Sequence, residues 1–197
     1  MADTFHTIAA PAEAVFREKM SKFIAFAHPV ASVEQAKELI NKYQKEYFDA
    51  RHVCWAYMLG ADRLTFQQND NGEPSGTAGK PILGQINSFG LTNIIIIVVR
   101  YFGGIKLGTS GLIAAYREAA RLAIEEAEII ERHELTEISF NFGYIAMNDV
   151  MKIVKQPGIT TISQQFDNIC AMTIAVRSDH APEITARLTA IPTLTLA

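Results

Sequence analysis

The sequence predicts an α+β protein of two domains, residues 1–132 and 133–197, organised as a two-domain α/β sandwich. Three observations predict this class. A run of β-branched residues at 94–99 predicts a strand buried on both faces. Apolar side chains recur at helical spacing after Ser32 and again from residue 110 to 128. From residue 134 onwards the expected elements follow in the order βαββαβ, which is typical of a ferredoxin-like domain.

The first domain is expected to begin with strands and to end with a long helix. Two apolar runs between residues 12 and 31 predict a β-hairpin or meander. Ser32 precedes a helical pattern of apolar residues, and Gln35 follows three positions later, so Ser32 is the expected N-cap. The remaining elements are strands at 52–59 and 63–68, a short helix at 77–88, the buried strand at 94–99 and a long helix at 110–128.

The second domain repeats the alternation of strands and helices on a smaller scale. An alternating pattern at 134–142 predicts a strand, and residues 146–155 predict a helix that ends at the Pro157-Gly158 turn. The further elements are strands at 159–166 and 168–176 around a tight turn at Asp167, a helix at 179–190 and a closing strand at 193–196.

Length, charge and cysteine content exclude several classes of protein. The 197 residues are 49% hydrophobic and 20% charged with a net charge of -3, which argues against a protein that coats nucleic acid by charge alone. Cys54 and Cys170 form neither a disulfide framework nor a four-ligand zinc site. Residues 1–5 lack the pattern of a secretion signal, and no apolar run is long enough to span a membrane. We expect a cytoplasmic protein with no cofactor, no metal site and no membrane partner.

Two glycine-rich segments, at residues 71–81 and 100–111, carry the strongest functional signal. They contain seven of the chain's 12 glycines, and glycine lets a backbone approach a ligand closely. Each segment leads into an expected helix, where free N–H groups and the helix dipole favour an anion. No Asp or Glu occurs between residues 78 and 117, whereas four cations do. An anionic partner is therefore expected at these loops: a phosphate, a nucleotide or an RNA backbone.

The predicted anion or nucleic-acid site combines these cations with loop residues and aromatic side chains. Tyr101 and Phe102, beside Arg100, are expected to offer a stacking face for a base. An alternative interpretation remains open, in which the glycines only serve tight turns and the aromatic residues only pack the loop. The candidate binding residues are Lys80, Arg100, Tyr101, Gly103, Gly104, Lys106, Gly108, Thr109, Ser110 and Arg117.

Three other residues are catalytic candidates. His52 and Cys54 are separated by one position on a strand, so both side chains are expected on the same face. They suit a nucleophile pair or half of a metal site, although a hydrogen-bonded histidine on a partly buried strand is the simpler interpretation. Glu73 lies close to the basic loops and suits a general base, or an acceptor for its own turn.

Four stretches resemble the IMPACT/YigZ family: residues 21–24, the pattern around His52 and residues 54–57, residues 70–79, and residues 98–112. The resemblance implies a first domain similar to domain IV of elongation factor G and a ferredoxin-like second domain similar to its domain V. It also implies a role in the regulation of translation or in stress responses, and it brings no accepted catalytic mechanism. Ser110 stands where the family usually has glycine.

Two functions from different classes follow from these observations. The first is a non-enzymatic protein that binds RNA, the ribosome or another translation component through its basic glycine-rich surface. The alternative is an enzyme or sensor for a small phosphorylated ligand or nucleotide, with Glu73 as the base and the loop at 103–111 holding the phosphate. A third possibility is a protein–protein adaptor with purely architectural loops.

Overall fold

The computed structural model describes residues 4–197, which form two compact units. The first unit ends at Arg132 and the second spans His133–Ala197. Residues 1–3, on which part of the argument about a secretion signal depends, lie outside the described residues. Helices and strands are mixed in both units, which confirms the predicted α+β class. Each unit has a hydrophobic core of its own.

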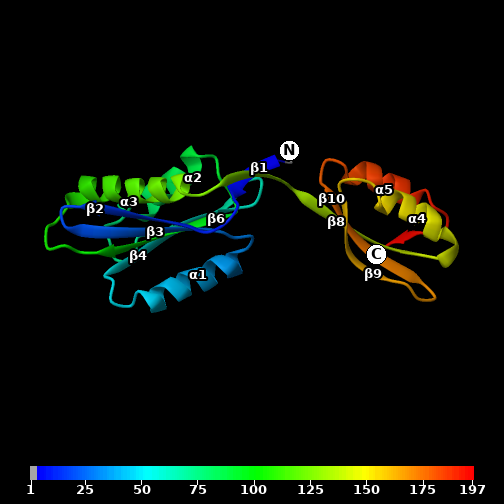
Figure 1. Ribbon diagram of the computed structural model, residues 1–197, viewed down its shortest axis with the longest axis horizontal. Coiled ribbons are helices and arrows are strands. Elements are labelled where there is room, and N and C mark those ends of the chain that lie inside the picture. The colour runs from blue at the N-terminus through cyan, green and yellow to red at the C-terminus, as the bar shows by residue number, and fades with distance from the viewer. Residues whose placement is uncertain (1–3) are drawn as a thin grey trace. The chain divides into compact units, whose positions relative to one another are not determined.

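A five-stranded antiparallel sheet forms the centre of the first unit (Figure 1). Its strands pair in the order β2-β3-β6-β4-β5. Its middle strand contains the β-branched run, and residues 94–99 are 0% exposed. The expectation of a strand buried on both faces is therefore confirmed. The strands are β2 (Ala12–Glu18), β3 (Ser21–Pro29), β4 (His52–Leu59), β5 (Thr65–Asn69) and β6 (Ile94–Tyr101).

Helices cover both faces of this sheet (Figure 1). On one face lies α1 (Val33–Glu46), and on the other lie α2 (Gly79–Ser88) and α3 (Gly108–Glu125). Because side chains alternate along a strand, Cys54 packs in the core beneath α2 and α3, whereas Tyr57 packs on the side of α1. This alternation decides which strand residues reach the candidate site.

The predicted cap of α1 is present. The Ser32 hydroxyl accepts a hydrogen bond from the amide of Gln35 at 3.2 Å, and the Gln35 side chain accepts one from the amide of Ala31 at 2.8 Å. Side-chain oxygens thus take up amides that the helix itself leaves unpaired.

Several boundaries differ from expectation for identifiable reasons. The helix expected at 77 starts at Gly79, because the amide and hydroxyl of Thr77 both bond to the Pro74 carbonyl in a turn. The helix expected at 110 starts two residues earlier, at Gly108. A two-stranded sheet of β1 (Thr4–Ile8) and β7 (Ile129–His133) was not predicted. Its two strands are far apart in the chain, so no local sequence pattern predicts that they pair.

The second unit has the predicted βαββαβ order and a four-stranded antiparallel sheet in the order β11-β8-β10-β9. The first and third strands lie side by side in the middle, as in a ferredoxin-like domain. The predicted tight turn at Asp167 is longer, since residues 166–169 all lie outside the two strands. The elements are β8 (Leu135–Phe142), η1 (Tyr144–Ala146), α4 (Met147–Val154), β9 (Ile159–Gln165), β10 (Cys170–Arg177), α5 (Ala181–Thr189) and β11 (Thr195–Leu196).

Among the helices of residues 4–197, none combines the length and the apolar character that a membrane-spanning segment needs.

Candidate anion-binding site

The loop that follows β5 is fastened to β4 by three consecutive residues of that strand. His52 donates a hydrogen bond from Nδ1 to the Asn71 carbonyl at 2.7 Å, because a carbonyl oxygen can only accept. The amide of Val53 donates to the side-chain oxygen of Asn71 at 2.7 Å, and the Cys54 thiol donates to the Asp70 carbonyl at 3.0 Å. The first glycine-rich segment is thereby held in a single position on the sheet.

The N-terminus of α2 is already occupied by an anion of the protein itself. One carboxylate oxygen of Asp70 accepts a hydrogen bond from the amide of Gly76 at 2.8 Å. The other accepts from the amides of Ala78 and Gly79, at 3.0 and 2.8 Å. The expectation of free amides at this helix is therefore wrong, because a carboxylate inside the same loop satisfies them.

A buried cluster of polar side chains lies where this loop meets β6 and α3. Glu73 Oε1 accepts hydrogen bonds from Arg100 Nη1 and from the Tyr116 hydroxyl, each at 2.7 Å. Glu73 Oε2 lies 3.8 Å from His52 Nε2. The guanidinium of Arg100 also lies 5.5 Å from the ring centre of Phe23. These contacts make Glu73 and Arg100 a buried, internally neutralised pair.

The geometry of this cluster disfavours the nucleophile pair. Burial raises the pKa of the Cys54 thiol, and the hydrogen bond with Tyr116 offsets this only in part. Burial likewise raises the pKa of Tyr116, so both groups stay protonated near neutral pH. The two side chains lie on the same face of the sheet, as predicted, but His52 is hydrogen-bonded to the loop and not to Cys54. The structure therefore fits the simpler interpretation, a hydrogen-bonded histidine on a partly buried strand beside an unreactive thiol.

A pocket of about 450 Å³ opens beside the cluster, between this loop and the start of α3. His52, Glu73 and Arg100 line it and are at least nine-tenths buried. Phe102, Lys106, Gly108 and Thr109 line it from the second glycine-rich segment, and Arg51 lines it from the residue before β4. The structure thus brings both predicted loops to one cavity.

The N-terminus of α3 differs from that of α2 in being uncapped. Its N-cap position is held by Leu107, which makes no capping hydrogen bond through its side chain, and its first turn contains no acidic residue. Gly108 has a φ of +73°, a conformation that favours glycine, and lines the pocket together with Thr109. The amides and the positive end of the α3 dipole are therefore available to an anion in the pocket.

Two cations stand at this pocket without a carboxylate partner. Lys106 and Arg51 are both exposed, and neither has an ion-pair partner within 4.0 Å among residues 4–197. Arg100, by contrast, has only 7% of its side chain exposed and is paired with Glu73. The cationic character of the pocket therefore comes from Lys106 and Arg51.

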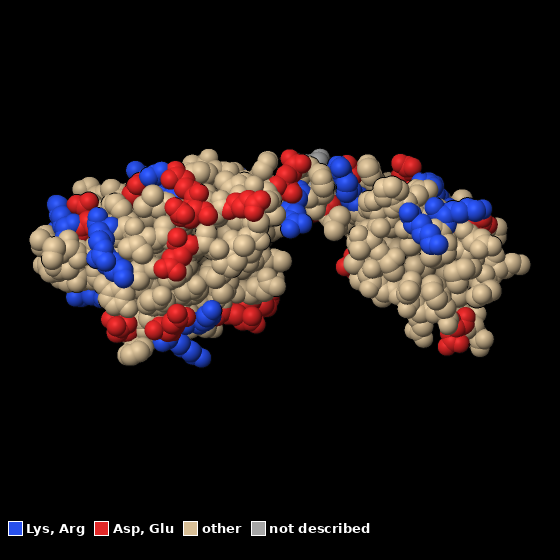
Figure 2. Space-filling model, in the orientation of Figure 1, with Lys and Arg blue, Asp and Glu red and all other residues tan. Residues whose placement is uncertain are grey.

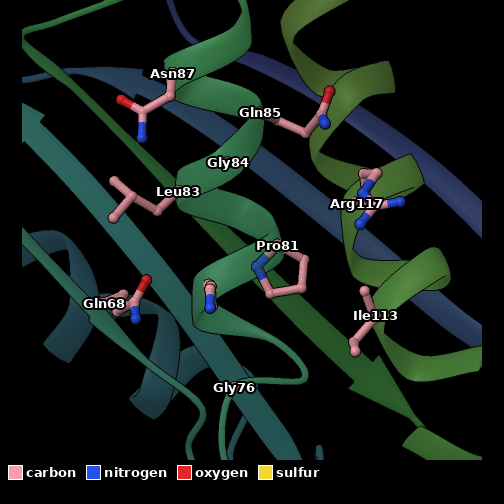
Figure 3. Close-up of a pocket in the computed structure, with 10 residues that line it drawn as sticks. Gln68, Gly76, Pro81, Leu83, Gly84, Gln85, Asn87, Ile113 and Arg117 are labelled. Atoms are coloured by element: carbon pink, nitrogen blue, oxygen red, sulfur yellow. The ribbon is translucent and has the colours of Figure 1, made fainter. Parts of the chain in front are cut away.

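The other two predicted cations, Lys80 and Arg117, lie at a separate groove of about 790 Å³ along α2 (Figure 3). Figure 3 shows Arg117 and Ile113 on α3, Gln85 on α2 and Gln68 on a strand nearby. Both cations are exposed and have no ion-pair partner in the described part of the chain. The groove contains no acidic lining residue. The four expected cations therefore divide between two cavities instead of converging on one.

Other candidate residues have roles that the sequence did not indicate. Tyr101 points to the side of α1 and donates a hydrogen bond to Asp49 at 2.8 Å, so it lies away from the pocket. Gly103 packs so closely on the β2–β3 turn that an added Cβ would lie 2.1 Å from the backbone of Met20. Gly104 has a φ of +90° and serves a turn, and neither it nor Ser110 lines the pocket or the groove.

Two pocket residues with functional side chains, Arg51 and Phe102, are not among the predicted binding residues, although Phe102 was named with Tyr101 as a stacking face. Arg51 precedes His52 and lies outside the acid-free stretch of residues 78–117 on which the charge argument depended. The ring of Phe102 is 41% exposed and lies 5.6 Å from the Arg100 guanidinium. The alternation of side chains along the chain separates Phe102 from Tyr101, because Arg100 and Phe102 line the pocket and Tyr101 points to the other side.

Positive charge does not extend across the whole of the first unit. On the face visible in Figure 2, acidic and basic side chains are interspersed, which is typical of an ordinary soluble surface. Within residues 4–197, no three His, Cys, Asp or Glu side chains are grouped so that they would hold a metal ion. The features that favour an anion are local to the pocket and the neighbouring groove.

Comparison with known proteins gives consistent matches. Residues 19–124 match the sequence model of the Impact N-terminal domain. The IMPACT family member YigZ of Escherichia coli (strain K12) is 34% identical over 182 residues, which cover 91% of this chain and 89% of that protein. An IMPACT family member of Haemophilus influenzae is 36% identical over 158 residues, covering 77% and 76% of the two chains. A solved crystal structure of a hypothetical protein, 32% identical, covers 100% of this chain and 97% of its own with a TM-score of 0.78.

Proposed function

The chain belongs to the IMPACT family, and from this premise we propose that it takes part in the regulation of translation as a non-enzymatic protein that binds RNA on or near the ribosome. The single observation that carries the binding role is the mouth of the pocket. There, an uncapped helix N-terminus and two cations without carboxylate partners, Arg51 and Lys106, lie together. Helix N-termini and cations of this kind hold phosphate oxygens.

The groove beside α2 extends the proposed surface. Pro74 lines the pocket and Gly76 lines the groove, while the neighbouring α3 residues Leu112 and Ile113 likewise divide between the two. One loop and one helix therefore border both cavities. A polyanion that crosses this loop would meet Lys106 and Arg51 on one side and the two groove cations on the other. Contacts of this type are sensitive to salt and largely independent of base sequence.

The buried polar cluster supports binding over catalysis. Glu73, the one candidate for a general base, is engaged by Arg100 and Tyr116 at a single oxygen. The Cys54 thiol is fully buried. Both groups stabilise the loop that shapes the pocket. A protein with this role would work in the cytoplasm, where translation takes place, and we include that location in the proposal.

The proposal is tested by measuring the affinity of the full chain for structured ribosomal RNA over a salt series, together with co-sedimentation with ribosomes. Arg51→Ala and Lys106→Ala should each weaken binding and lower the slope of log K against log salt by about one. Lys80→Ala and Arg117→Ala should act in the same direction.

Matched controls come from the opposite face of the sheet. Lys37 and Lys45 are exposed lysines of α1, so Lys37→Ala and Lys45→Ala remove the same charge far from the proposed surface. Both should leave affinity and salt slope close to those of the wild type. RNA binding that is equally weakened by the control variants, or unaffected by Arg51→Ala and Lys106→Ala, would contradict the proposed surface.

A further inference from the structure

We propose that the pocket between the two glycine-rich loops is built for a nucleoside monophosphate, presented as the phosphorylated end of an RNA or as a free mononucleotide. This inference rests on the proposed anion-binding function of the same pocket and specifies its ligand. It follows from three groups on the pocket wall, each of which suits a different part of such a molecule.

The first group is the cationic mouth, which suits a phosphomonoester. Arg51, Lys106 and the uncapped start of α3 face the same cavity. A phosphomonoester carries about 1.5 to 2 negative charges near neutral pH, whereas a phosphodiester within an RNA chain carries about one. Two cations and a helix N-terminus match the larger charge. A terminal phosphate is therefore the better fit than a phosphate in the middle of a chain.

The second group is His52 at the base of the pocket. Its Nδ1 is committed as a donor to the Asn71 carbonyl at 2.7 Å, so in the neutral ring Nε2 is left as an acceptor. Glu73 Oε2, at 3.8 Å, is too far away for a hydrogen bond and has no proton to donate when ionised. Within residues 4–197 no donor reaches this Nε2, although the residue is only 9% exposed.

Because His52 lines the pocket, this nitrogen can accept a hydrogen bond from a ligand or from water. The hydroxyl of a ribose supplies one. The neighbouring Arg100, which also lines the pocket, has a buried Nε with no hydrogen-bond partner among the described residues. The base of the pocket thus retains hydrogen-bonding capacity that the protein does not use.

The third group is the aromatic ring of Phe102. It lines the pocket, is 41% exposed and lies 5.6 Å from the Arg100 guanidinium, which is itself held by Glu73. An exposed ring beside a fixed cation offers a flat surface on which a nucleobase can stack. A pocket volume of about 450 Å³ also falls within the usual range for small-molecule sites, which is about 300 to 1,000 Å³.

The ligand is tested with AMP, adenosine and inorganic phosphate, each titrated calorimetrically into the full chain. AMP should bind about tenfold or more tightly than either of its parts, because it alone engages all three groups. Equal affinity for AMP and inorganic phosphate would overturn the proposal and leave a simple anion site. No binding of AMP or of phosphorylated RNA would also overturn it.

A second experiment distinguishes an RNA end from a free mononucleotide as the ligand. One short RNA is prepared in four forms: with a 5′-phosphate, with a 3′-phosphate, with hydroxyl ends and as a circle. Phosphorylated RNA that binds about tenfold more tightly than the circle, and more tightly than AMP, identifies an RNA end. AMP that binds as tightly as the phosphorylated RNA identifies a free mononucleotide. A circle that binds as tightly as the phosphorylated RNA, with the salt dependence described above, would overturn this inference while leaving the proposed RNA-binding function intact.

Variants separate the parts of the site without disturbing the core. Phe102→Ala should weaken AMP binding and leave phosphate binding unchanged, whereas Lys106→Ala should weaken both. Phe66 is an exposed phenylalanine of β5 outside the pocket, so Phe66→Ala is the matched control and should change neither. A Phe102→Ala variant with wild-type affinity for AMP would contradict the stacking surface.

Discussion

Glu73 Oε1 lies 2.7 Å from Arg100 Nη1, and the two side chains are only 3% and 7% exposed. The same oxygen accepts a hydrogen bond from Tyr116. These residues belong to the loop after β5, to β6 and to α3, so the ion pair and this hydrogen bond together join three segments at the pocket. The pair adds no net charge to the cavity, and its contribution is to hold the shape of that cavity.

Removal of Glu73 should therefore destabilise the first unit strongly. Glu73→Ala leaves the Arg100 guanidinium buried without a counter-ion, and the free energy of unfolding should fall by about 3 to 5 kcal/mol. Glu73→Gln keeps an acceptor and should cost less. Glu183 forms an exposed pair with Arg187 at 3.7 Å, so Glu183→Ala is the control and should cost less than about 1 kcal/mol. Denaturant unfolding checks these values, and similar stability of Glu73→Ala and Glu183→Ala would contradict the assignment.

The capping role of Asp70 predicts a second loss of stability. Asp70→Ala leaves three amides without an acceptor, that of Gly76 in the loop and those of Ala78 and Gly79 at the start of α2, and the free energy of unfolding should fall by about 1 to 2 kcal/mol. Asp149 lies in the first turn of α4, where its side chain is 60% exposed, so Asp149→Ala serves as a control with a smaller effect. A thermal or denaturant melt of both variants tests this. An Asp70→Ala protein as stable as the wild type would show that water replaces the carboxylate without cost.

Gly103 should not tolerate even a methyl group. Gly103→Ala places a Cβ 2.1 Å from the backbone of Met20, so the β2–β3 turn must move, at a cost of about 1 to 3 kcal/mol. Gly84 lies within α2, where an added Cβ meets no atom within 4 Å. Gly84→Ala should therefore raise stability by up to about 1 kcal/mol. Opposite signs for the two alanine variants in denaturant unfolding are the expected result, and a stabilising Gly103→Ala would refute the close contact.

The two thiols should be unreactive in the folded protein. Cys54 and Cys170 are each 0% exposed, and burial raises the pKa of the Cys54 thiol, so little thiolate forms near neutral pH. A thiol-specific reagent should therefore modify neither cysteine under native conditions and both in denaturant. The Cys54→Ser variant shows which cysteine has reacted, because its unfolded chain has only the Cys170 thiol left to modify. Rapid modification of Cys54 in the native state would revive a catalytic role for it.

Much of the fold was predictable because the local patterns agree with the packing. The β-branched run at 94–99 is the buried central strand, and the βαββαβ order of the second unit is present in space. The pairing of β1 with β7 was not predictable, because it joins two short strands from opposite ends of the first unit. The residues at which α2 and α3 begin, Gly79 and Gly108, were not predicted exactly. The start of α2 depends on a hydrogen bond in the preceding turn, which the spacing of apolar residues does not reveal.

The candidate site was predictable as a region but not residue by residue. The sequence by itself determined that two glycine-rich loops precede helices and that His52 and Cys54 share one face of a strand. Only the tertiary structure decided which positive groups are available to a ligand. Arg100 is neutralised by Glu73, 27 residues away in the chain, and the amides of α2 are taken by Asp70. The availability of a charge depends on which partner the fold places within hydrogen-bond distance, and that distance is set by contacts between segments that are remote in the chain.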